Sequence, residues 1–223
     1  MNNETTNNLQ KFYLAYFGRP ADPGGINYWL TCLNDSLTMK DISVELSRQE
    51  EYKHLSLNKC FQEKINDIHF NLFNRKADIH VLNYLKQMIE EIGYTISDIV
   101  YYFIFPQTNS ITIEKEQKEV DQNVLNHKIM AAEIFTNKID QSIFLRQLYQ
   151  PESISPWVNS KSFDTVSDFF LNINFDLVSQ ESLNELINSF SDISIQNLTT
   201  PVIEIKDLSL SIPINYLNNR SFT

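Results

Sequence analysis

Apolar positions recur at helical spacing from the start of the chain. The first stripe follows the i, i+3, i+4, i+7, i+8 pattern of one helix face, through Leu9, Phe12, Tyr13, Tyr16 and Phe17. Gly18 comes next, and glycine is the residue that most often closes a helix. The pattern therefore predicts a helix over 9–17.

Two more helices are expected before the pattern changes. Asp22 followed by Pro23 marks a helix start, because an N-cap carboxylate accepts exposed backbone N–H groups and proline suits the first helical position. A third helix is predicted to begin at Thr38 or Lys40 and to run to about Tyr52. The second helix has one apolar face, formed by Ile26, Trp29, Leu30 and Leu33.

The same plan returns 56 positions later. Residues 16–29 match residues 72–85 without a gap, and Phe, Arg, Ala, Asp, Asn and Tyr keep their register. Asp78 takes the capping position, and residues 97–103 follow the third helix at an offset of 57. A fixed internal period defines the structural unit. The sequence thus predicts two tandem three-helix repeats, 9–52 and 61–105, in a segment spanning 1–106.

Residues 107–198 are expected to add helices to the same domain. A charged helix from Glu114 to Leu148 has one apolar face, and shorter helices are predicted over 163–171 and 179–190. After a linker, residues 202–212 alternate with strand periodicity. A lone strand is not stable, so we expect 199–223 to begin a following domain and the chain to be a fragment. The predicted class is all-α with a short C-terminal β segment.

Composition and charge narrow the range of partners. The chain of 223 residues is 42% hydrophobic, which is enough for a core. Its net charge of −10 disfavours nucleic acid and anionic membranes, because both bind clustered Lys and Arg. Neutral glycans, cations and basic proteins stay open as partners. The N-terminus has no signal-peptide pattern and no apolar run is long enough to span a bilayer, so we expect a soluble protein made without the general export signal.

The sequence contains no catalytic or metal-ligating constellation that we can identify. Cys32 and Cys60 form no C-x-x-C pair; two reduced thiols are favoured, and a disulfide stays open. His69 continues an apolar stripe, which favours a core position. The histidines lie at no zinc-ligand spacing: His54, His69, His80 and His127. We therefore expect no enzyme activity, no cofactor and no metal.

The repeated turn offers one candidate binding site. Its residues are Arg19, Asp22, Asn27 and Tyr28, and an aromatic ring beside planar hydrogen-bonding groups suits a sugar. Capping by Asp22 and packing explain most of the same residues without a ligand, and that structural interpretation is favoured. Arg19 could bridge to the Asp22 carboxylate or to helix-terminal carbonyls. The second copy keeps the corresponding residues, Arg75, Asp78, Asn83 and Tyr84.

The turn also carries a family resemblance. Residues 9–136 resemble the bacterial family called domain of unknown function 4214, whose pattern is aliphatic-Gly-Arg, then x-x-Asp-Pro-x-Gly-aliphatic-x-Tyr-Trp. The match runs from Phe17 to Trp29, and a later stretch, 126–136, is similar to the family's Asn-Lys-aliphatic-x-x-Ala-x-x-Phe-Thr helix. The second copy is degenerate, because Asn74 replaces the glycine and residues 79–81 replace Pro-Gly-Gly. The resemblance implies a glycan context, since family members occur in surface-layer proteins, some of them held by lipopolysaccharide, and beside glycosyltransferases.

A second resemblance covers the tail. Residues 202–222 look like the first strand of the ATP-binding subunit of a polysaccharide or O-antigen ABC exporter. Together the two resemblances imply a non-catalytic, cytoplasmic accessory domain, N-terminal to an ABC-type ATPase, that recognises the glycan or a biosynthesis partner among exporter subunits. The alternative is an N-terminal lipopolysaccharide-attachment domain of a surface-layer or secreted protein at the cell surface. A glycosyltransferase comes third.

Overall fold

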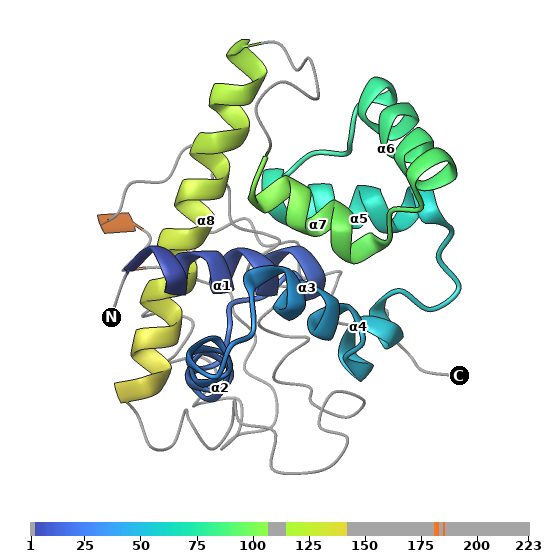
Figure 1. Cartoon of the computed structure of the whole chain (residues 1–223). Helices are drawn as coiled ribbons and strands as arrows, with labels where there is room; N and C mark the ends of the chain where they lie inside the picture. Colours follow the sequence, from blue (N-terminus) through green and yellow to red (C-terminus); the bar gives the residue numbers. More distant parts are fainter. Residues whose placement is uncertain (1–2, 107–114, 142–180, 183–184, 186–223) are drawn as a thin grey trace, which may run out of the picture.

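The computed structural model describes residues 3–106 and 115–141, together with 181, 182 and 185 (Figure 1). Over these residues the fold is all-α, and the described ranges contain no strand. None of the described helices is both long and apolar enough to cross a membrane. The helices are α1 (Asn3–Phe17), α2 (Pro23–Asn34), α3 (Met39–Ser47), α4 (Glu50–Leu55), α5 (Phe61–Phe73), α6 (Ile79–Ile92), α7 (Ile96–Ile104) and α8 (Lys115–Gln141).

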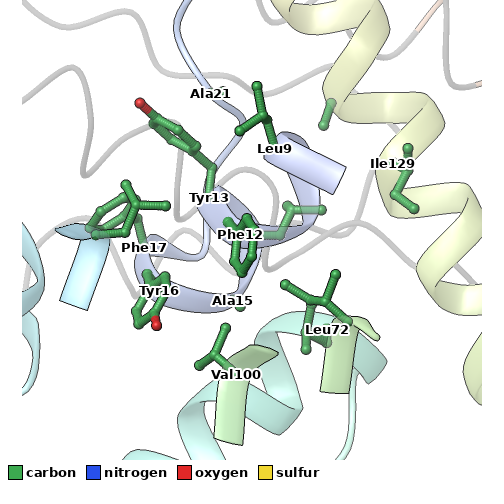
Figure 2. Packing of buried hydrophobic residues seen from close by; sticks show 14 of the residues in the cluster. Leu9, Phe12, Tyr13, Ala15, Tyr16, Phe17, Ala21, Leu72, Val100 and Ile129 are labelled. Carbon is green, nitrogen blue, oxygen red and sulfur yellow. The ribbon is translucent and has the colours of Figure 1, made fainter. Parts of the chain in front are cut away.

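Helix α1 lies at the centre of the core. From Asn8 to Phe17 every residue except Lys11 is buried, as expected of a helix covered on all sides. Helices α2, α3, α4, α5, α7 and α8 all pack against it. Figure 2 shows Leu72 of α5, Val100 of α7 and Ile129 of α8 approaching α1 from different directions. A smaller cluster lies between α5, α6 and α7 and contains Ile65, Ala77, Val81, Leu82, Leu85 and Ile99.

The predicted end of the first helix and the predicted start of the second are confirmed, although α1 begins earlier than expected, at Asn3. Gly18 closes α1 in the left-handed region, at φ 64°. Asp22 caps α2, because its Oδ1 accepts a hydrogen bond from the Gly25 amide at 2.6 Å. Thr38 caps α3 in a reciprocal capping box with Asp41. These are short-range interactions, and the chain encodes them within four residues.

The third helix was expected to run unbroken to Tyr52, and this expectation is wrong. Helix α3 ends at Ser47, and Gln49 adopts an extended conformation before α4 begins at Glu50. The break turns α4 so that Glu51 and Tyr52 are buried against α1. The Tyr52 ring packs edge-on against Tyr16 with centroids 5.0 Å apart. Burial of this face holds the new direction of the chain.

Positions 56 residues apart share local geometry. Asn74 closes α5 at φ 57°, as Gly18 closes α1. The backbone N–H of Ala21 donates to the Gln10 side-chain oxygen, and that of Ala77 donates to the Asn66 side-chain oxygen. Asp78 occupies the N-cap of α6, but its carboxylate makes no capping hydrogen bond. It lies instead 3.0 Å from the Arg75 guanidinium.

The matched helices also contact each other. Helix α1 packs on α5, and α3 packs on α7. The Asn71 amide donates to the Ala15 carbonyl oxygen, and these two residues lie at matched positions, 56 apart. Thr95 caps α7 in the same capping box that Thr38 forms at α3. Lys40 of α3 pairs with Asp98 of α7 at 3.1 Å.

Helix α8 crosses α1, α2 and α5 (Figure 1). Its predicted apolar face is buried through Val124, Ile129, Ala132 and Phe135. The part expected beyond Gln141 lies outside the described residues, as do the predicted helix at 163–171 and the strand at 202–212. Of the predicted helix at 179–190, the structure describes Glu181, Ser182 and Glu185, which are helical.

Candidate functional site

A pocket of about 440 Å³ opens beside the turn at 18–22, between α1 and α2. It lies where α1, α2 and the α3–α4 break meet. Its size falls within the usual range for small-molecule sites. The pocket is lined by Tyr13, Phe17, Asp22, Gly24, Gly25, Tyr28, Trp29, Leu46, Gln49 and Glu51.

The start of α2 shapes one side of this pocket. Asp22 is buried at the N-cap, and its bond to Gly25 holds the first turn in place. Gly25 allows a close approach, because a Cβ at this position would overlap the Tyr13 hydroxyl. Burial raises the pKa of Tyr13, and the nearby Asp22 carboxylate raises it further. Tyr13 therefore stays neutral.

Aromatic rings form a second side. Trp29 is buried and donates a hydrogen bond from Nε1 to the Tyr13 hydroxyl oxygen at 3.2 Å. Tyr28 packs edge-on against Trp29, with ring centroids 4.8 Å apart, yet it is 60% exposed. A hydrogen bond with the half-buried Cys32 is the main cause that raises the pKa of Tyr28. The rim therefore presents a large aromatic surface whose position is fixed by Trp29.

A buried ion pair supports the pocket from beneath. Arg19 has no exposed surface, and its Nε and Nη2 donate to the two Glu51 oxygens at 2.7 and 2.8 Å. Its Nη1 donates to the Pro20 carbonyl at 3.0 Å and lies 3.9 Å from Asp22 Oδ2. Bidentate pairing of this kind is the strongest that arginine forms with a carboxylate. The pair fixes α4 against the turn at 18–22.

Glu51 is a residue that the sequence analysis missed. The sequence places a second carboxylate, Glu50, next to it, and paired carboxylates at a helix end have an ordinary explanation. A buried arginine needs an anion beside it, and this need identifies Glu51. The need becomes visible only when the structure shows that Arg19 is buried.

The four predicted site residues do not gather at one place. Asp22 and Tyr28 line the pocket, and Arg19 lies under it without lining it. Asn27 is exposed and lines a different hollow, of about 560 Å³, with residues such as Thr5 and Asn34. Adjacent positions on a helix point about 100° apart, so Asn27 and Tyr28 face different surfaces.

Arg75 lies 56 positions after Arg19 and also pairs with a carboxylate. It donates to both oxygens of Asp121 in α8, at 2.8 and 2.7 Å. Asn83 is exposed, and Tyr84 is half-buried against the smaller cluster. Both arginines are thus paired, by carboxylates of different helices.

The remaining candidate ligands take structural positions. His69 is buried, and its Nδ1 donates to the Arg75 carbonyl oxygen at 2.9 Å, which confirms the expected core position. Cys32 and Cys60 are both free thiols, as the favoured interpretation had it. Within the described ranges, no group of three or more His, Cys, Asp or Glu residues could hold a metal ion.

Comparison with known proteins adds no assignment. No protein-family model matches the chain, and neither the curated proteins nor the solved structures contain a match. The pocket and the sequence resemblances are therefore the basis for a functional proposal.

Proposed function

We propose that the chain is a non-catalytic glycan-binding domain that serves surface-polysaccharide export, as an accessory to an ABC-type ATPase. The observation that carries the proposal is the pocket beside the turn, with Tyr28 exposed on its rim and Asp22 in its wall. Apolar sugar faces stack on aromatic rings, and sugar hydroxyls bond to carboxylates, amides and backbone groups. Gln49 and the glycine-lined start of α2 supply the polar groups.

The site is built on fixed elements, as a binding site requires. Asp22 is held by the α2 cap, Trp29 by its bond to Tyr13, and Glu51 by Arg19. We also propose that 9–52 and 61–105 are two copies of one unit, related to domain of unknown function 4214. The matched turns at Gly18 and Asn74 support this relation.

Polysaccharide binding tests the proposal directly. Surface polysaccharide from the encoding bacterium should bind the full chain in isothermal titration calorimetry. Tyr28→Ala should weaken that binding by about tenfold, which corresponds to about 1.4 kcal/mol. Asn27→Ala is the matched control, because Asn27 lies next in sequence but outside the pocket. Absence of binding, or an equal effect of both folded variants, would reject the glycan role.

The export context rests on the tail resemblance and has its own test. The full protein should co-purify from its native host with the membrane subunits of a polysaccharide exporter. A chain that binds the polysaccharide but is recovered on the outer surface, without those subunits, would instead support the alternative role as an attachment domain.

A further inference from the structure

We propose that the pocket selects a sugar that carries a free ammonium group, with Asp22 as the counter-ion. This inference rests on the proposed glycan-binding function and adds the chemical class of the sugar. Three features support it: the charges that line the pocket, the different numbers of hydrogen bonds that Asp22 and Glu51 accept, and the aromatic rings beside these two carboxylates.

Among the described residues, the lining carries negative charge only. Asp22 and Glu51 are the charged members of this described lining, which contains no Lys, Arg or His. Of the described charged groups at the pocket, two are carboxylates and one, the Arg19 guanidinium beneath them, is positive. A uronate or a phosphorylated sugar would meet these two carboxylates, and like charges in a partly buried site repel. A cationic sugar would restore the balance.

Asp22 is the carboxylate that keeps acceptor capacity for a ligand. Both oxygens of Glu51 accept short hydrogen bonds from Arg19. Oδ1 of Asp22 accepts from the Gly25 amide, but Oδ2 lies 3.9 Å from Arg19 Nη1, beyond hydrogen-bond range. Asp22 is also one of the residues that line the pocket. An ammonium group has three donors and can reach such an oxygen.

The aromatic side of the pocket favours the same charge. Cations are attracted to the faces of tryptophan and tyrosine rings. Arg19 already makes cation–π contacts here, since its guanidinium carbon lies 5.3 Å from the ring centroids of both Tyr13 and Phe17. Tyr28 and Trp29 both line the pocket, and the Tyr28 ring is exposed on its rim, where a ligand would contact it. Acetylation of the amine would remove the charge while leaving the sugar ring unchanged.

A matched set of sugars tests this selectivity. The probes are 2-amino-2-deoxyhexoses of the gluco, galacto and manno series, each compared with its N-acetyl and 2-hydroxy counterparts. Binding to the full chain is measured by ligand-observed NMR near neutral pH, in about 0.15 M salt to screen long-range attraction. We expect the amino form of at least one series to bind about tenfold more tightly than its two counterparts, as a charge-assisted hydrogen bond implies.

Two variants separate the pocket charge from the overall charge. Asp22→Asn removes the carboxylate but keeps the N-cap, because asparagine caps as well as aspartate. It should abolish the preference for the amino form. Glu50→Gln makes the same change of charge at an exposed position outside the pocket, and it should leave the preference intact.

The outcomes distinguish this inference from the function on which it rests. Equal binding of the three forms in every series, or a preference that survives in Asp22→Asn, would overturn the ammonium selection and leave glycan binding standing. Loss of the preference in both variants would assign it to the net charge of the chain and would also overturn it. Absence of binding by all the probes would overturn it as well, and the polysaccharide titration would then decide the proposed function.

Discussion

Arg19 and Glu51 lie 32 residues apart and form a bidentate ion pair with no exposed surface on the arginine. The pair joins the end of the first repeated turn to α4. It also separates two helices, α3 and α4, that helical periodicity alone would merge. The pair thus holds α4 against the turn at 18–22, beside the pocket.

Loss of Glu51 should destabilise the fold strongly. Glu51→Ala leaves Arg19 buried without its main anion, and breaking a buried pair in this way costs about 3 kcal/mol. Glu45→Ala, which removes a partner of the exposed Arg48, should cost less than about 1 kcal/mol. Urea denaturation followed by circular dichroism measures both. The double variant Arg19→Met, Glu51→Met should recover part of the loss; a double variant no more stable than Glu51→Ala would contradict the proposed role of the charge.

The close approach of α2 to α1 should not tolerate a side chain at Gly25. Gly25→Ala places a Cβ against the Tyr13 hydroxyl, and overpacking of this kind costs about 1–3 kcal/mol. Tyr13→Phe removes the oxygen and leaves the nearest ring carbon 3.1 Å from the added Cβ. The double variant Gly25→Ala, Tyr13→Phe should therefore be more stable than the sum of the single effects predicts. Additive effects in thermal denaturation would show that the hydroxyl is not the obstacle.

Asn74, which closes α5 in the left-handed conformation, should tolerate replacement by glycine but not by alanine. Asn74 has φ 57°, and its buried Oδ1 has no hydrogen-bond partner within the described residues. Asn74→Gly should be close to neutral, because glycine adopts this conformation without strain. Asn74→Ala should cost about 1 kcal/mol or more, since Cβ disfavours the left-handed region. Equal stabilities of the two variants would show that backbone conformation does not decide this position.

His69 should make stability fall in mild acid. Burial lowers the pKa of His69 below its ordinary value of 6.5, although the bond to the Arg75 carbonyl acts in the opposite direction. The unfolded chain therefore takes up a proton before the folded chain does, so stability is highest above 6.5 and falls as pH decreases from there towards the folded pKa. Chemical denaturation at a series of pH values measures the fall.

A variant isolates the contribution of this histidine. His69→Asn keeps a side-chain N–H for the Arg75 carbonyl oxygen but does not titrate in this range. Its stability should change less than that of the wild type across the same pH window. An identical pH dependence of the two proteins would assign the effect to other groups.

The sequence by itself determined the helical class and several helix ends of the described part. Gly18, Asp22 and Thr38 act on backbone groups within four residues, so their effect is readable without a fold. The apolar stripes likewise identified buried positions on α1, α2 and α8, although α1 is buried on almost every side and not along the stripe alone. Such signals are local, and local geometry of a helix is set by its own sequence.

Only the tertiary structure decided which distant groups meet. Arg19 takes its anion from α4, whereas Arg75 takes its anion from α8, across 32 and 46 residues. The break before Glu50 goes with the packing of α4 on α1, which buries Glu51 and Tyr52. A buried charge selects its partner after the chain has been brought together, and no periodicity encodes that choice.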